Sequence, residues 1–213
     1  MHLTIFGAAG NTGIRVVAEA VSRGHQVTAV VRDPSRAAAF PPTVTVRAGD
    51  ATDVDAVAAL ATGQDAVLSA TRPAPGDEAA HTTMAKALLA GVARTGTRLL
   101  AVGGAGSLTV PGSGGVLAVD DPSFVPPAWR AIAQSCNDQW EVYRTDTEAD
   151  WTYLSPPALL EPGTRTGRYR LGHDELLIDA AGRSAISMED LAVALLDETE
   201  NPRHHHRRFT VGY

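Results

Sequence analysis

Three glycines stand near the start of the chain, at Gly7, Gly10 and Gly13 in the stretch IFGAAGNTGIRVV. A glycine turn between a strand and a helix lets the backbone approach a pyrophosphate closely. It also offers free N–H groups at the helix N-terminus, where the helix dipole favours anions. The dinucleotide fingerprint is spaced GxGxxG and the spacing here is GxxGxxG, so the match lies in mechanism and context. A tight glycine turn with no ligand is the alternative interpretation.

The stretch VVRDPSR, after the second apolar run, indicates which dinucleotide would bind. Enzymes that use NAD usually have an acidic residue there for the ribose 2′-hydroxyl, whereas the 2′-phosphate of NADP needs a cation. Arg32 stands at this position, and a guanidinium binds phosphate bidentately. We therefore predict NADP as the cofactor, with NADPH preferred over NADH, provided that Asp33 points away. The alternative for Arg32 is a solvated surface charge, and Arg36 is expected to be solvated.

Few side chains are candidates for catalysis. Ser107, in VGGAGSL, could donate a hydrogen bond to a substrate carbonyl or to the nicotinamide amide, or it could be a turn serine. Tyr153 lies in a predicted strand next to the expected pocket, although a strand tyrosine commonly packs in the core. We predict no metal site, because the three consecutive histidines 204–206 cannot all face one ion on a regular element.

Apolar strand-like runs alternate with helix-period segments along most of the chain. A capping pattern starts one helix at Thr52 and another at Ser187, and an apolar stripe beginning at Trp129 marks a long helix. Repeated strand–helix units imply a parallel sheet covered on both faces, so we predict a single Rossmann-type, doubly wound α/β domain over residues 1–213. The expected strands are 2–6, 27–31, 43–47, 65–69, 98–102, 151–154 and 208–211.

Ligands of such sheets bind outside the carboxyl ends of the strands, where the strand order reverses. Two long Gly- and Pro-rich segments, at about 103–127 and 156–174, are expected at this edge. Connections of that length are usually lids, binding loops or disordered segments. The alternative is variable surface.

The composition of the chain indicates which classes of binding partner to expect. A net charge of -6 without long blocks of like charge gives no reason to expect nucleic acid or a membrane as partner. The single cysteine, Cys136, is expected in the core and agrees with a reducing compartment, so we expect a cytoplasmic protein. The expected partner is a small-molecule substrate, and monomer and homodimer both stay open.

Together these motifs resemble the atypical short-chain dehydrogenases/reductases, in particular the small NAD(P)H-binding proteins typified by biliverdin IXβ reductase, also called flavin reductase. The resemblance covers nearly the whole chain, through GAAGNTG, VVRDPSR, AGDATD, GQDAVLSATRP, VGGAGSL and GRSAIS. It implies that the glycine turn holds the pyrophosphate, that Asp50 and Ala51 flank the adenine, and that residues 70–72 line the ribose and nicotinamide. The implied cofactor-binding set is Gly7, Gly10, Asn11, Thr12, Gly13, Arg32, Asp50, Ala51, Ala70, Thr71, Arg72 and Gly103.

The main short-chain group uses a Tyr-x-x-x-Lys pair, which this chain lacks, because its one lysine, Lys86, follows Thr82 at that spacing. Tyr169 and His173 share the spacing but are expected in a loop, which makes the match a coincidence. Hydride transfer needs no protein acid when the acceptor is easily reduced. We therefore expect an NADPH-dependent oxidoreductase that reduces a small planar acceptor such as a flavin or quinone. The alternatives are a non-catalytic NADP-binding sensor of the NmrA-like type and an epimerase-like, non-redox enzyme.

Overall fold

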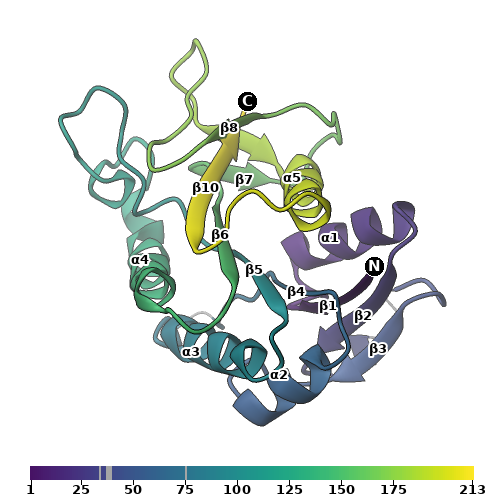
Figure 1. The fold of residues 1–213 in the computed structure, drawn as a ribbon. Coiled ribbons are helices and arrows are strands. Elements are labelled where there is room, and N and C mark those ends of the chain that lie inside the picture. Colours follow the sequence, from purple (N-terminus) through teal and green to yellow (C-terminus); the bar gives the residue numbers. More distant parts are fainter. Residues whose placement is uncertain (34, 37–39, 75) are drawn as a thin grey trace.

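A computed structural model describes residues 1–33, 35–36, 40–74 and 76–213 (Figure 1). Eight strands form one sheet in the order β3-β2-β1-β4-β5-β6-β10-β8. Neighbours are parallel except β8, which runs antiparallel to β10. The strands are β1 His2–Phe6, β2 Gln26–Val31, β3 Thr45–Ala48, β4 Ala66–Ser69, β5 Arg98–Val102, β6 Trp151–Ser155, β8 Arg170–Gly172 and β10 Arg207–Gly212. The predicted α/β class and doubly wound parallel sheet are confirmed.

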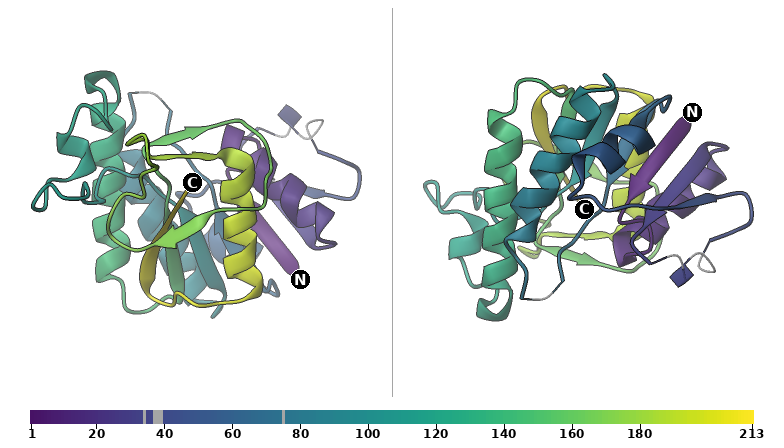
Figure 2. Two further views of the ribbon diagram at one scale, coloured as in Figure 1. Left: turned by 90° about the horizontal axis from the view of Figure 1, so that it is seen from above. Right: turned by 90° about the horizontal axis from the view of Figure 1, so that it is seen from below.

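Helices cover both faces of this sheet (Figures 1 and 2). Helices α1 and α5 pack side by side on one face, and α2, α3 and α4 pack in turn on the other. Alternating side chains along each strand feed the two cores: Ile5 belongs to the core under α1 and α5, and Phe6 to the core under the other helices. The helices are α1 Asn11–Ser22, α2 Val54–Ala61, α3 Ala80–Ala93, α4 Arg130–Thr145 and α5 Met188–Glu200.

Two expectations about helix ends have different outcomes. Ser187 caps α5, with its side chain accepting from the N–H of Asp190, as predicted. The predicted cap of α2 at Thr52 is wrong, because the N-cap is Asp53, whose carboxylate accepts from two backbone N–H groups of the first turn. The hydroxyl of Thr52 instead donates to the carboxylate of Asp50. Adjacent residues that can both cap leave the choice to such tertiary contacts.

The two long segments at the carboxyl edge are packed structures. Segment 103–127 contains the short helix η2 (Ala118–Asp120) and reaches η3 (Pro127–Trp129), and its Leu108 and Ala118 are buried against Leu176. Segment 156–174 is not loop throughout, since it contains β7 (Leu159–Glu161) as well as β8; β7 pairs with β9 (Ala185–Ser187).

A buried carboxylate holds the second segment against α5. Asp190 has no exposed surface and accepts hydrogen bonds from the backbone N–H groups of Thr166 and Gly167, from the Thr166 hydroxyl and from Tyr213. Burial raises the pKa of Asp190, but these hydrogen bonds lower it more, and the net pKa is below its ordinary value.

Across the described part of the chain, every helix is too short or too polar to span a bilayer.

Candidate functional site

The glycine turn connects β1 to α1 at the point where the strand order reverses between β1 and β4. Gly7 has φ +71°, which side chains other than glycine rarely adopt, and a Cβ there would lie 2.5 Å from the carbonyl oxygen of Ala70. A Cβ on Gly13 would lie 2.1 Å from the carbonyl oxygen of Gly7. The turn is thus pressed between the end of β4 and the first turn of α1. Two of its glycines are needed for packing alone.

The first turn of α1 has no side-chain cap. Gly10 is the N-cap in an extended conformation, with no hydrogen bond from a side chain, and its own N–H donates to the carbonyl of Gly7. Asn11 and Thr12 follow at the surface, and the first turn contains no acidic residue. Backbone N–H groups and the positive end of the helix dipole therefore face outward, which fits the pyrophosphate of a dinucleotide.

Arginines lie beside this turn. Arg36 is exposed, as expected of a solvated charge, and it also donates from Nη2 to the carbonyl oxygen of Ala9 at 3.0 Å, so it contacts the glycine turn. Arg32 is exposed at the end of β2. The pKa of Asp50 is lowered, first by hydrogen bonds from Thr52 and also by the charge of Arg32.

Asp33 was expected to point away from the phosphate position. Its carboxylate accepts from the N–H and the hydroxyl of Ser35, at 2.9 and 2.8 Å, in a local turn. These two hydrogen bonds hold the Asp33 carboxylate within its own turn. The guanidinium of Arg32 at the end of β2 is then available to bind a phosphate. Pro34 of the VVRDPSR motif lies outside the described residues.

The end of β4 supplies the next part of the site. The N–H of Ala70 continues the ladder by donating to Phe6 at 3.0 Å, and the Thr71 hydroxyl lies 3.0 Å from that of Ser69. Ala51, at the end of β3, is buried. Ala70 and Thr71 are therefore in direct contact with the glycine turn, although they are far from it in the sequence, whereas the described hydrogen bonds connect Ala51 to neither.

Tyr153 is wholly buried beneath Gly103. A Cβ on Gly103 would lie 1.9 Å from the Tyr153 hydroxyl oxygen, and this hydroxyl donates to Oε1 of Gln139 at 2.9 Å. Burial raises the pKa of Tyr153 well above its ordinary value. Neither solvent nor a substrate reaches the hydroxyl in this structure, so Tyr153 forms the floor on which the Gly103 backbone rests.

Ser107 occupies a different environment, above β10. It is partly exposed, and its Oγ lies 2.7 Å from Nη1 of Arg208, whose Nε and Nη2 donate to the carboxylate of Asp174. The Arg208 guanidinium also lies 4.5 Å from the centre of the Trp140 ring. Sequence reasoning missed Arg208. The available signal was a charged residue on the face of the last strand that alternation buries.

A cavity of about 180 Å³ opens between the segment after β4 and the start of α4. The exposed Arg72 guanidinium lies 5.7 Å from the centre of the Trp129 ring, and both side chains line this cavity. Trp129 is 56% exposed. The predicted apolar stripe of α4 is therefore core only toward its C-terminal end, because the start of the helix borders the cavity.

Two further polar groups, His81 of α3 and Cys136 of α4, contact each other between these helices and are not among the residues that line this cavity. His81 is buried and its Nδ1 lies 2.8 Å from the Ser135 hydroxyl; burial, then the charge of Arg72, lowers its pKa to about 4. Cys136 is half-buried and would contact a Cβ on Gly104; burial raises the pKa of its thiol to about 11. Both side chains are therefore uncharged near neutral pH.

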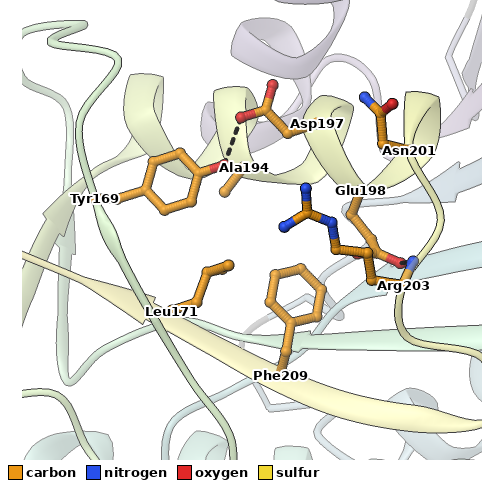
Figure 3. A pocket seen from close by; sticks show the side chains of 8 residues that line it. All are labelled: Tyr169, Leu171, Ala194, Asp197, Glu198, Asn201, Arg203 and Phe209. Carbon is orange, nitrogen blue, oxygen red and sulfur yellow. Dashed lines mark hydrogen bonds between the residues drawn. The ribbon is translucent and has the colours of Figure 1, made fainter.

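A second cavity, of about 170 Å³, lies between α5 and β10, away from the glycine turn (Figure 3). The hydroxyl of Tyr169 donates there to Asp197. Glu198 accepts from the backbone N–H groups of Arg203 and His204, which ties the chain after α5 to the helix. The side chains of His204 and His205 contact two different carboxylates, those of Glu198 and Asp150. This cavity brings together none of the residues predicted for the cofactor or for catalysis.

The chain is similar in sequence and in structure to known proteins. A family model described as NAD(P)H-binding matches residues 7–202. The uncharacterized protein YwnB of Bacillus subtilis is 38% identical over 99% of this chain and 98% of its own. A candidate epimerase from Bacteroides thetaiotaomicron is 37% identical, with a TM-score of 0.90 over 100% of this chain and 96% of its own. A candidate NADH-flavin reductase from Streptococcus pneumoniae is 31% identical, with a TM-score of 0.86 over 100% and 99% of the two chains.

Proposed function

The chain belongs to the NAD(P)H-binding family, and from that premise we propose that it is an NADPH-dependent oxidoreductase that reduces a small planar acceptor, such as a flavin or a quinone. The observation that carries the proposal is the uncapped glycine turn at the strand-order reversal, with Arg32 and Arg36 beside it. The likeness to the candidate NADH-flavin reductase supports a redox activity over dinucleotide binding alone.

The residues divide into three roles along the carboxyl edge. The backbone of the glycine turn and the first turn of α1 would hold the pyrophosphate, and Arg32 would bind the 2′-phosphate at the end of β2. Asp50 and Ala51 would border the adenine, and residues 70–72 with Gly103 would border the ribose and nicotinamide. When bound, the cofactor supplies the hydride, and the protein's part is to orient it and to exclude competing reactions.

The acceptor would enter the cavity next to this edge. Trp129 offers an exposed ring for stacking on a planar molecule, and Arg72 offers a cation beside it. Ser107 would donate a hydrogen bond to a carbonyl of the acceptor or to the nicotinamide amide. We give Tyr153 no part in the chemistry, because its hydroxyl is buried and already donates to Gln139. Water would supply the proton.

The test mixes purified protein with NADPH and a panel of flavins and quinones, and follows nicotinamide absorbance. Consumption of NADPH with at least one acceptor is expected. Saturable binding of NADPH without oxidation by any acceptor would contradict the proposal and favour the NADP-binding sensor. The likeness to a candidate epimerase gives a specific second possibility, a non-redox enzyme that retains its nucleotide. Purified protein that carries tightly bound nucleotide and does not exchange it with added NADPH would favour that alternative.

A further inference from the structure

Arg208 is a buried cation of β10 that contacts Ser107, in the segment that follows β5. It stands at the start of β10, in register with Tyr153 of β6, and its side chain is 6% exposed. Its ion-pair partner Asp174 is 73% exposed, so most of the desolvation falls on the guanidinium. Burying a cation is costly unless its N–H groups are satisfied. Here the Asp174 carboxylate accepts hydrogen bonds from two of the N–H groups of Arg208, and a third N–H donates to Ser107. The Trp140 ring packs against one face of the guanidinium.

This contact fixes the direction of the Ser107 hydroxyl. A guanidinium has donors and no acceptor, so the 2.7 Å contact with Nη1 uses a lone pair of the serine oxygen. The O–H hydrogen must then point away from Arg208, and none of the described residues accepts it. Because Ser107 is partly exposed at the carboxyl edge, its hydrogen is available to a bound ligand. The same cation polarises the hydroxyl and strengthens its donation.

We infer that Arg208 is a positioning residue that acts through Ser107: it holds the serine oxygen as an acceptor, so that the hydroxyl donates to the carbonyl that gains negative charge when the acceptor is reduced. The inference rests on the proposed function. Hydride and its two electrons reach the acceptor from the reduced dinucleotide, Ser107 stabilises the resulting oxyanion by a hydrogen bond, and the final proton comes from water. A cation in contact with a hydroxyl thus does part of the work of the absent Tyr-x-x-x-Lys pair.

The experiment is a double-mutant cycle with S107A, R208Q and the double variant. Two quantities are measured: kcat with NADPH and menadione, and the affinity of menadione for the protein saturated with non-reacting NADP⁺, by calorimetry. R208Q is expected to lower kcat about 10-fold in the presence of Ser107, the effect of losing one charge-assisted hydrogen bond. In the S107A background, R208Q should lower kcat by less than about 2-fold, because the hydroxyl through which Arg208 acts is already absent. The menadione affinity should show the same coupling with a smaller effect, because the carbonyl of oxidised menadione accepts the hydrogen bond without the negative charge that it gains on reduction.

Arg98 provides a matched control for the general effect of losing a buried arginine. It is also about 9% exposed and pairs with Glu198, but it lies at the opposite end of β5. R98Q should lower the melting temperature without changing kcat or coupling to S107A. If R208Q does not fold, R208K replaces it in the double-mutant cycle, because lysine keeps the positive charge but lacks the planar, forked donors of arginine.

Additive losses from S107A and the Arg208 variant, in kcat and in menadione affinity, would overturn the inference and make Arg208 a purely structural residue. Wild-type protein that binds NADP⁺ but oxidises no NADPH would instead contradict the proposed function. In that case the menadione affinities of the four proteins still measure the coupling between Arg208 and Ser107. A failure of the inference can therefore be distinguished from a failure of the proposed function.

Discussion

Replacing Gly13 by alanine is the most direct test of the glycine turn as the dinucleotide site. The new Cβ would lie 2.1 Å from the carbonyl oxygen of Gly7, and real Cβ atoms do not approach closer than 3.0 Å. Either Gly7 or the start of α1 must therefore move by about 0.9 Å. Gly7 is itself held against the backbone of Ala70, so the turn has little room to yield on that side.

The expected cost has two parts. Overpacking a tight contact destabilises a protein by about 1–3 kcal/mol, and for a chain of this size each kcal/mol lowers the melting temperature by about 2–4 °C. Losing one hydrogen bond to a charged phosphate costs about 1.5–3 kcal/mol, which weakens NADPH binding by about 10- to 100-fold. Binding is measured by titrating NADPH and following its nicotinamide fluorescence, and melting by calorimetry without ligand.

Gly24→Ala is the matched control. Gly24 has φ +79° just after α1, and nothing lies within 4 Å of the position of a Cβ. Alanine there carries the backbone cost of the left-handed conformation, about 1–2 kcal/mol, but displaces nothing near the turn. Its affinity for NADPH should equal that of the wild type despite a similar loss of stability. Wild-type NADPH affinity in Gly13→Ala, or an equal loss in both variants, would refute the assignment.

Three further changes test other parts of the molecule. Arg32→Ala should weaken NADPH binding about 10-fold and leave NADH binding nearly unchanged, since only NADPH has the 2′-phosphate; equal loss for both dinucleotides in titrations would show that Arg32 holds something else. Trp129→Ala should raise KM for a quinone acceptor several-fold, with NADPH affinity unchanged, because the ring lines the cavity and not the turn; steady-state kinetics would contradict this if KM for NADPH changed instead. Asp190→Asn should lower the free energy of unfolding by about 2 kcal/mol at neutral pH, since it loses hydrogen bonds to a buried carboxylate. The folded-state pKa of Asp190 is depressed, so its stabilisation is complete above about pH 4 and is lost as pH falls through that value toward the folded pKa. Urea unfolding between pH 3 and 7 should then show a shallower acid loss in the variant than in the wild type.

The sequence was sufficient for the fold because its signals are local and repeated. Short continuous apolar runs placed β1, β2, β4, β5 and β6 within a residue or two of the structure, and parallel pairing followed from the connecting helices. The glycine turn was also predictable, since Gly7 and Gly13 are required by backbone geometry that any side chain would disturb. The short strands β7, β8 and β9 were missed, because three residues are too few for periodicity to show.

The parts of the site that escaped prediction are set by contacts between distant segments. Arg36 reaches Ala9 across 27 positions, and Arg208 reaches Ser107 across 101. An arginine in the sequence shows its charge but not its hydrogen-bond partner, so the contact of the exposed Arg36 with Ala9 was not predicted. Alternation puts Tyr153 on a buried face, but only the structure shows that the end of its ring lies directly under Gly103.

These contacts also explain how one edge of the sheet can bind both an anionic cofactor and a planar acceptor. Toward β2 the available groups are backbone N–H donors and exposed guanidinium groups, which suit phosphate. Toward α4 they are an exposed indole and one arginine beside it, which suit an aromatic ring with little charge. Ser107, with its oxygen held by Arg208 of β10, follows β5 along the chain and lies farther along the sheet edge from the phosphate-binding groups than β4. The hydroxyl of Ser107 is proposed to act on the carbonyl of the acceptor and not on the phosphates of the dinucleotide, so the effect of Arg208 should be visible in the ternary complex and weak in binding of the dinucleotide alone.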